Sequence, residues 1–332
     1  MKGRNRKIIV FILLSVVFEI IFTSMCYATD LPFKEIQENT IIVDKNKEGD
    51  YTSIQEAINK EPEGTTIYIK NGVYNEILTI KKKINIIGES KENTIIHSKS
   101  EQNKYSIYLG VPEIVIEKLS IKNSGPGLYT SGIKIVASKT HILDCYIYDT
   151  PVGIAVFTSS NKIENCEFFG CTDEGIVLLG TSYSECKDNK IINCKFYNNC
   201  DGIELQYSTD NLITNCEFYN NTHTGIDAIV SSNDRNIISN CKIYNNQVHG
   251  LYLSSSSYNK IIDCNILDND NGNIVINKDS QNNEIISESY EGKENKNENN
   301  LKVTLSLLLC KRFIRPIIKK ISVINYKIMT VF

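Results

Sequence analysis

One recurring sequence motif limits the folds that this chain can adopt. It opens with Gly followed by Ile or Leu, passes through a bend rich in Ser and Asn, and ends with an Asn-Cys pair and a Tyr/Phe-Asn exit. The openings fall, with variations, at Gly132, Gly153, Gly175, Gly202, Gly225 and Gly250, with a looser copy at Gly272. Their spacing runs from 21 to 27 residues. A period of that size predicts a solenoid of stacked, similar units.

A second series repeats the same period independently of the glycines. It consists of Cys145, Cys166, Cys194, Cys216, Cys241 and Cys264, each followed by a short aliphatic or aromatic segment. These segments alternate apolar with polar residues and are separated by Asn, Ser, Asp and Gly, which favours short strands joined by turns. We therefore predict an all-β fold, a right-handed, single-stranded parallel β-helix of roughly nine or ten coils.

The alternation also predicts where individual side chains point. Ile226, Ile237 and Ile243 are expected to face the interior, between coils that pair about 4.8 Å apart. A further series is expected to stack at the bends, because Asn tolerates left-handed backbone conformations. Its members are Asn189, Asn211, Asn236 and Asn259.

The cysteine series predicts buried thiols. One cysteine per coil, about 4.8 Å from the next, is a poor geometry for disulfides, whose Cβ atoms lie nearer 3.8 Å apart. The six are interpreted as small buried hydrophobic residues. Cys171, Cys186 and Cys200 lie outside the series, and Cys171 with Cys200 is the pair expected if any disulfide forms. A zinc site is not expected, because the sequence has no CxxC motif.

The N-terminus carries the features of a secretory signal. Basic residues precede an apolar run over 8–22, and the small residues that suit cleavage lie just before Thr29. We predict a signal peptide over residues 1–28 and a secreted or cell-surface protein, with a retained membrane anchor as the alternative. Residues 29–64 are expected to form a cap of one strand and one short helix. Ser53 with Glu56 predicts a capping box at the start of that helix, and Ile54, Ala57 and Ile58 share its apolar face.

The stretch from Thr40 to Ser98 resembles the opening of secreted β-helix proteins, including pectin methylesterases and NosD-type proteins. The matching segments are Ile41 to Asp44, Asp50 to Ile58, Thr66 to Glu76 and Ile84 to Glu89. Resemblance to the pectin-lyase-like superfamily covers about Thr40 to Ser289, and it implies a β-helix over residues 65–290 with carbohydrate-binding or sugar-hydrolysing relatives.

No catalytic signature accompanies that resemblance. Pectin methylesterases are expected to show a Gln-Asp pair and an Asp-Phe-Ile-Phe-Gly segment, and neither is present. Asn221-Thr222-His223 and Val248-His249-Gly250 are degenerate echoes of polygalacturonase motifs. An active pectin methylesterase is therefore excluded by its missing motifs, whereas a polysaccharide lyase or a glycoside hydrolase stays open.

The C-terminal region breaks the repeat. Residues 291–300 are predicted to be a polar linker, and residues 301–332 a basic amphipathic tail with seven Lys and Arg and no acid. Such a tail can lie on an anionic membrane surface. A cap on the last coil or a disordered tail are the alternatives.

The distribution of net charge narrows the classes of binding partner that we expect. The formal charge of −3 divides into +3 for residues 1–28, +7 for residues 301–332 and therefore −13 for residues 29–300. An acidic body disfavours nucleic acid and favours cations or neutral glycans. The chain has no Trp, but its 18 Tyr can stack on sugars. We expect a monomer that binds a polysaccharide or a surface glycan.

Aligning the coils on their glycines brings acids and histidines to one edge. Two residues after each Gly the series is Lys134, Ala155, Val177, Glu204, Asp227 and Tyr252. Just before each Gly it is Ser131, Val152, Glu174, Asp201, Thr224 and His249, with Asp173 and His223 one residue earlier. We call the edge formed by the predicted site residues the candidate strip. These residues are Glu174, Asp201, Glu204, His223, Asp227, His249 and Tyr252.

Roles follow from the chemistry of these groups. Glu204 and Asp227 should lie about 5 Å apart, close enough to raise one carboxyl pKa, to divide acid and base roles, or to share Ca²⁺. His249 is expected to donate or accept a proton, and Tyr252 to stack on a sugar. Glu174, Asp201 and His223 are expected to bind substrate.

Three classes of function stay open at this point: a carbohydrate-active or carbohydrate-binding β-helix, a NosD-like accessory protein that holds copper through His223 and His249, and a structural or adhesive solenoid. A solvated acidic face is the alternative to a site.

Overall fold

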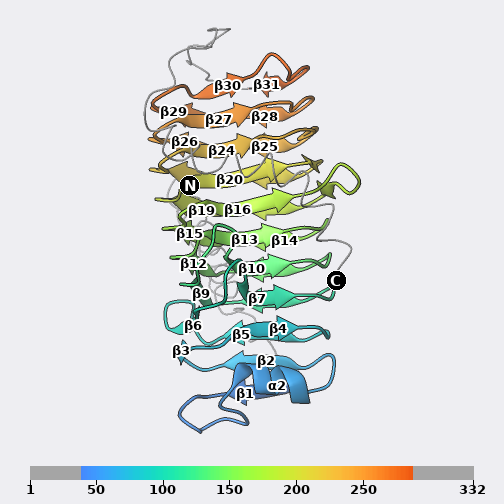
Figure 1. The fold of residues 1–332 in the computed structure, drawn as a ribbon, viewed down its shortest axis with the longest axis vertical. Coiled ribbons are helices and arrows are strands. Elements are labelled where there is room, and N and C mark those ends of the chain that lie inside the picture. Colours follow the sequence, from blue (N-terminus) through green and yellow to red (C-terminus); the bar gives the residue numbers. More distant parts are fainter. Residues whose placement is uncertain (1–38, 287–332) are drawn as a thin grey trace, which may run out of the picture. The chain divides into compact units, whose positions relative to one another are not determined.

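The computed structural model describes residues 39–286, which form a stack of parallel coils with one short helix at its N-terminal end (Figure 1). Each coil contributes a strand to each of three long sheets, and the stack has about ten turns. The strand pairs within these sheets are parallel, as in the register Ile203 to Ile226. The all-β solenoid predicted from the repeat is confirmed, and so is its number of coils.

Sheet 1 has eleven strands and the other two long sheets have nine each. Sheet 1 consists of β1 (Thr40–Val43), β2 (Thr66–Ile69), β5 (Asn85–Gly88), β8 (Val115–Glu117), β11 (His141–Leu143), β14 (Lys162–Glu164), β18 (Lys190–Ile192), β22 (Leu212–Thr214), β25 (Ile237–Ser239), β28 (Lys260–Ile262) and β31 (Glu284–Ile286). Sheet 2 consists of β3 (Gly72–Tyr74), β6 (Thr94–Ser98), β9 (Ser120–Asn123), β12 (Tyr146–Tyr148), β15 (Glu167–Phe169), β19 (Lys195–Tyr197), β23 (Glu217–Tyr219), β26 (Lys242–Tyr244) and β29 (Asn265–Leu267).

Sheet 3 carries the candidate strip. It consists of β4 (Leu78–Ile80), β7 (Tyr105–Leu109), β10 (Ser131–Ile135), β13 (Val152–Val156), β16 (Glu174–Leu179), β20 (Asp201–Gln206), β24 (Thr224–Ala228), β27 (His249–Leu253) and β30 (Ile274–Ile276). Two short strands, β17 (Cys186–Lys187) and β21 (Ser208–Thr209), form a small separate sheet. The loop of residues 180–185, between β16 and β17, explains the longest glycine spacing, from Gly175 to Gly202.

The interior explains why glycine recurs. Phe168, Phe196 and Phe218 stack along the axis with ring centroids 4.8 and 4.7 Å apart. A Cβ on Gly202 would lie 2.6 Å from Cδ1 of Phe218 and 2.4 Å from the carbonyl oxygen of Gly225. Any side chain there would collide with the ring and with the next coil, so the opening residue of the strand has to be glycine.

One of the three predicted inward isoleucines was placed wrongly. Ile226 and Ile243 are fully buried, as predicted, but Ile237 is 37% exposed and Ile238 takes the interior position. The cause is the bend before β25, where the Asn236 side chain is already turned inward and hydrogen-bonded to neighbouring coils. Since side chains alternate along a strand, the residue after an inward Asn points outward.

The asparagine series does stack, but for a different reason from the one predicted. Each backbone N–H donates to the side-chain oxygen of the Asn one coil further on, as from Asn189 to Asn211 at 2.9 Å and from Asn211 to Asn236 at 2.9 Å. Left-handed backbone belongs instead to the residue just before, such as Asp188 at φ 55° and Asp210 at φ 56°. The buried amide side chains therefore act as hydrogen-bonding rungs between coils.

The helix α2 (Ile54–Lys60) buries Ile54, Ala57 and Ile58, as predicted. Ser53 caps it by accepting from the Glu56 N–H at 3.2 Å. The expected return bond from Glu56 is not what holds this end. The Glu56 carboxylate instead pairs with Lys60 at 2.6 Å, and Glu76 accepts from the Ile54 and Gln55 N–H groups at 3.0 and 2.9 Å.

All nine cysteines of the described region are free and buried. The interpretation of the six regular cysteines as buried residues is confirmed, and Cys171 and Cys200 do not form a disulfide. The thiols of the six regular cysteines donate to carbonyl groups two residues earlier, as from Cys216 to Thr214 at 3.3 Å. Burial also raises the pKa of the Cys186 thiol to about 12.

Several predicted segments lie outside the described residues: the signal peptide (1–28), the first part of the cap (29–38), the linker (291–300) and the basic tail (301–332). Within residues 39–286, no helix has the length and apolar character needed to cross a membrane.

Candidate functional site

The candidate strip lies on the outward face of sheet 3. Ile203 and Leu205 point inward from β20, so Glu204 between them points outward. Parallel pairing then places Glu204 beside Asp227 and Asp227 beside Tyr252. Glu174 pairs with Asp201 in the same way, one coil earlier. The column predicted from glycine spacing is therefore present in the register.

These outward acids are nevertheless shielded from solvent. Glu174, Asp201, Glu204 and Asp227 are each between 3% and 8% exposed, and His223 is 8% exposed. Charged groups with so little water around them need partners or must change protonation state.

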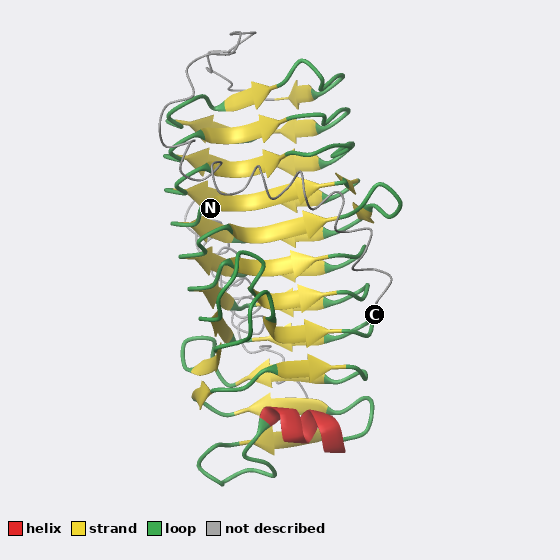
Figure 2. Ribbon diagram, in the orientation of Figure 1, coloured by secondary structure: helices red, strands yellow, loops and turns green. Residues whose placement is uncertain are grey.

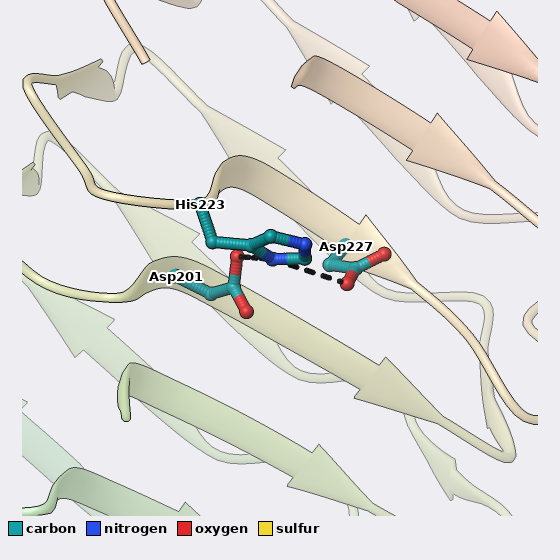
Figure 3. Close-up of side chains that lie close together, drawn as sticks. All are labelled: Asp201, His223 and Asp227. Carbon is teal, nitrogen blue, oxygen red and sulfur yellow. Dashed lines mark hydrogen bonds and ion pairs between the residues drawn. The ribbon is translucent and has the colours of Figure 1, made fainter. Parts of the chain in front are cut away.

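Asp201, His223 and Asp227 form a compact cluster, shown in Figure 3. Nδ1 of His223 lies 2.7 Å from Oδ1 of Asp201 and 3.8 Å from Oδ2 of Asp227. The Thr224 N–H donates to the same Asp201 oxygen at 2.7 Å, which fixes the carboxylate. A buried carboxylate on Nδ1 favours the tautomer with its proton there and its lone pair on Nε2, the arrangement that makes an imidazole a base.

Glu174 and Glu204 hold protons more tightly than ordinary carboxyls. Burial, then the Asp173, Glu204 and Asp201 carboxylates, raises the pKa of Glu174 well above its usual 4.5. Burial, then the charges of Asp227 and Asp173, does the same to the pKa of Glu204. Glu174 lies on β16 and Glu204 on the neighbouring strand β20, so the two carboxyls belong to adjacent coils. Both carboxyls therefore keep their protons to a higher pH than an ordinary glutamate, which suits a proton donor.

His249 and Tyr252 form a separate pair at one end of the strip. Their rings stack with centroids 5.3 Å apart, and the Tyr252 hydroxyl accepts from the Asn277 amide at 2.8 Å. His249 is not part of the Asp201–His223–Asp227 cluster. The catalytic role predicted for His249 and the sugar-stacking role predicted for Tyr252 stay predictions.

The geometry also offers a second set of candidate metal ligands, and the predicted Ca²⁺ site at Glu204 and Asp227 stays a prediction. Asp201, His223 and Asp227 each offer a ligand atom, and these atoms lie within 4.8 Å of one another, whereas Glu204 is not in that group. One imidazole nitrogen with two carboxylates suits Zn²⁺ or Cu²⁺ better than Ca²⁺, which prefers oxygen ligands throughout. The Nδ1 proton would have to leave before a metal could bind there.

Sequence reasoning missed two features that bear on the site. The hydrogen bond between His223 and Asp201 joins residues with different offsets from their glycines, so aligning glycines could not reveal it. Tyr129 was also missed. It stands on the turn 124–130, before the strip begins, and the length of that turn was the available signal.

Comparisons with known proteins support the architecture. Residues 44–249 match the family model described as the Pel9A-like, right handed beta helix region. The probable pectinesterase/pectinesterase inhibitor 13 of Arabidopsis thaliana is 24% identical over 156 residues, which are 42% of this chain and 25% of that protein. The chain thus spans about a quarter of the curated relative it matches.

Solved structures are similar at the level of the fold. A rhamnogalacturonan lyase superposes with a TM-score of 0.58 at 13% identity, over 82% of this chain and 92% of that one. Pectin methylesterase from carrot gives a TM-score of 0.52 at 16% identity, over 76% and 89%. A PL6 family alginate lyase gives 0.52 at 17% identity, over 74% and 38%. The pectin-lyase-like β-helix is therefore a fold that this chain shares with polysaccharide-processing enzymes.

Proposed function

The chain belongs to the Pel9A-like right-handed β-helix family, and from that premise we propose that it is an exported, monomeric protein that binds or processes a polysaccharide at the outward face of sheet 3. The observation that carries the proposal is the pairing of a proton donor and a proton acceptor within two adjacent coils. The donor is the buried carboxyl of Glu204 on β20, and the acceptor is His223, which directly precedes β24 and is oriented by Asp201.

The roles follow from the protonation states. The carboxyl proton of Glu204 is delivered to the glycosidic oxygen of the leaving sugar. Nε2 of His223 takes a proton, either from a water that attacks the sugar or from a sugar carbon next to a carboxyl group. Asp201 acts as a positioning residue, because it fixes the His223 tautomer and stabilises the imidazolium that forms. The first route is hydrolysis and the second is elimination.

A glycan panel tests the proposal. Purified protein is incubated with polygalacturonate, alginate, rhamnogalacturonan and a neutral β-glucan, with release of reducing ends as one readout and ultraviolet absorbance of unsaturated ends as the other. Glu204→Gln and His223→Gln are expected to lower turnover by about 100-fold or more, as loss of a general acid or base does. Glu217→Gln is the matched control, since Glu217 lies on sheet 2 and pairs with Tyr244.

Failure of the wild-type protein to bind or cleave any glycan would contradict the proposal. Turnover in Glu204→Gln and His223→Gln that equals the wild-type rate would also contradict the assigned roles, because both side chains would then be dispensable. An asymmetric result, with only one variant impaired, would identify which half of the acid–base pair acts.

A second candidate is a cation site, favoured by the three ligand atoms within 4.8 Å at Asp201, His223 and Asp227. It would make the chain a metal-handling accessory protein, or would give a bound polysaccharide a cationic anchor. Titration with Zn²⁺, Cu²⁺ and Ca²⁺ by calorimetry separates these ions. Binding of Cu²⁺ that is lost in His223→Ala but kept in His249→Ala would support the cluster, and loss only in His249→Ala would contradict it.

Export and attachment to the cell surface complete the proposal. Residues 1–28 are proposed to be removed, and residues 301–332 to hold the protein to an anionic membrane. Intact-mass measurement of the exported protein checks the cleavage, because a mass that begins at Met1 contradicts it. Loss of membrane binding after deletion of 301–332 would support anchoring, whereas loss of stability alone would point to a cap.

A further inference from the structure

Two turns that lead into sheet 3 ahead of the candidate strip are longer than the turns that lead into the strands of the strip. Residues 99–104 join β6 to β7 and residues 124–130 join β9 to β10, whereas the corresponding turns of later coils are as short as 149–151 and 220–223. Figure 2 shows long loops beside the strands labelled β7 and β10 in Figure 1. Both turns come before the coils of the candidate strip. Like the turn 220–223, which carries His223 in a later coil, they connect sheet 2 to sheet 3.

The two long turns hold each other in place. The Asn103 N–H lies 3.1 Å from the carbonyl oxygen of Pro126 and 3.1 Å from the Thr130 hydroxyl oxygen, and the Tyr129 N–H donates to the Asn103 side-chain oxygen at 3.2 Å. Gly127 has φ +101°, in the range that favours glycine. The backbone that carries Tyr129 is therefore tied down at several points.

Tyr129 combines an exposed side chain with a place on the turn that precedes the candidate strip. The residue is 50% exposed. Burial, then the charges of Asp173, Glu174 and Glu204, raises the pKa of Tyr129. Ser131, two residues later, pairs with Val152 on β13, and β13 pairs with β16, which carries Glu174. Tyr129 thus stands about two coils, or about 10 Å, before the first acid.

Other tyrosines of the molecule are differently placed. On the outward face of sheet 2, Tyr197, Tyr219 and Tyr244 stack on one another with centroids 5.1 and 5.4 Å apart. Their ring faces are covered by their neighbours, so a sugar cannot lie flat on them. Among the described residues, no other aromatic ring stacks on Tyr129. A sugar ring needs such an open face.

We propose that Tyr129 is a binding subsite that stacks on one pyranose ring of the polysaccharide whose chain continues along the solenoid axis over Glu174 and Glu204. This rests on the proposed function, and it extends the site by two coils in the N-terminal direction. It makes the turns 99–104 and 124–130 the elements that set where the glycan chain begins. The substrate is then a chain of several sugar units rather than a monosaccharide or a disaccharide.

The absence of Trp from the chain allows a direct test. Tyr129→Trp introduces a single indole fluorophore at the proposed subsite, and Tyr183→Trp places one on the loop 180–185, where Tyr183 is 89% exposed. Both are titrated with the four polysaccharides named above. The Tyr129→Trp emission is expected to shift on addition of the glycan that binds wild type, and the Tyr183→Trp emission to stay unchanged.

Affinity measurements complete the test, with thermal unfolding of each variant as the folding control. Tyr129→Ala is expected to weaken binding of long chains by about tenfold, and Tyr129→Phe by less than about threefold, because the ring supplies the contact. Turnover of short oligosaccharides that reach only Glu204 is expected to change little. Wild-type affinity for long chains in Tyr129→Ala, with Glu204→Gln still impaired, overturns the subsite alone. Failure of wild type to bind any glycan overturns the subsite together with the proposed function.

Discussion

The outward faces of sheet 2 and sheet 3 both stack equivalent residues of successive coils, but sheet 2 stacks aromatic rings and sheet 3 stacks carboxylates. On sheet 2, Tyr148, Phe169, Tyr197, Tyr219 and Tyr244 stack in register with centroids 4.9 to 5.4 Å apart. On sheet 3, Glu204 and Asp227 occupy equivalent places on neighbouring strands. In-register coils repeat whatever stands at a position, so rings attract one another on one face and carboxylates repel one another on the other.

The difference separates structural residues from candidates for chemistry. Stacked rings add stability and cover each other, and hydroxyl contacts such as Tyr244 to Glu217 at 3.0 Å keep them in place. Stacked acids in a shielded place lower stability, and they raise the pKa values of Glu174 and Glu204. Groups whose pKa values are strongly shifted by burial and by neighbouring charges are more often functional than ordinary surface acids.

The largest expected loss of stability comes from a substitution in the interior, which lies behind both faces. Ile226→Asp would place an unpaired charge between coils and is expected to lower the free energy of unfolding by about 4 kcal/mol or more. Ile237→Asp is the matched control, since Ile237 is outward and the change there should be below about 1 kcal/mol. Chemical denaturation of both variants checks this. Equal stability losses would contradict the assigned directions of these two side chains.

A smaller effect is expected from interrupting the ring stack of sheet 2. Tyr219→Ala removes two ring contacts, at 5.1 and 5.4 Å, and should lower the free energy of unfolding by about 1–3 kcal/mol without changing glycan binding. Tyr183→Ala, at an exposed loop position, should change neither quantity. The comparison between the two faces would fail if Tyr219→Ala abolished glycan binding while leaving the melting temperature unchanged.

A gradual effect, which grows with pH, sharpens the description of sheet 3. A carboxyl whose pKa is higher in the folded protein stays protonated there after it ionises in the unfolded chain, so stability falls as pH rises above about 4.5. Each group contributes at most about 1.4 kcal/mol per pH unit in that window. Relative to wild type, the double variant Glu174→Gln, Glu204→Gln should therefore gain stability between pH 5 and about 7. Parallel denaturation curves for the two proteins across that range would contradict the raised pKa values.

Sequence could predict what depends on the period and could not predict what depends on side-chain packing. The register of Glu204 with Asp227 follows from counting, because every coil repeats the position after its glycine. The direction of Ile237 does not, since it depends on whether the preceding Asn turns into the interior. The hydrogen bond from His223 to Asp201 joins residues with different offsets from their glycines, and only the bend geometry brings them together.

The length of the turn 124–130 was the remaining sequence signal for the site, and this turn is not part of the repeated motif. Tyr129 belongs to a turn that no later coil reproduces, so an alignment of coils passes over it. The N-terminal resemblance predicted the fold through Ile54, Ala57 and the strands that follow, but it contains no residue of the strip. Fold information is therefore spread along the whole chain, whereas the candidate site lies in four consecutive coils.

The most direct test of the central claim is a crystal structure of the protein soaked with a mixture of oligosaccharides, with and without Ca²⁺ and Cu²⁺. The account predicts sugar density along the outward face of β16, β20 and β24, with a ring over Tyr129 and a glycosidic oxygen within hydrogen-bonding distance of Glu204. Density on sheet 1 or sheet 2 with none on sheet 3 would contradict it, and would leave the acids of the strip as shielded charges without a role in binding.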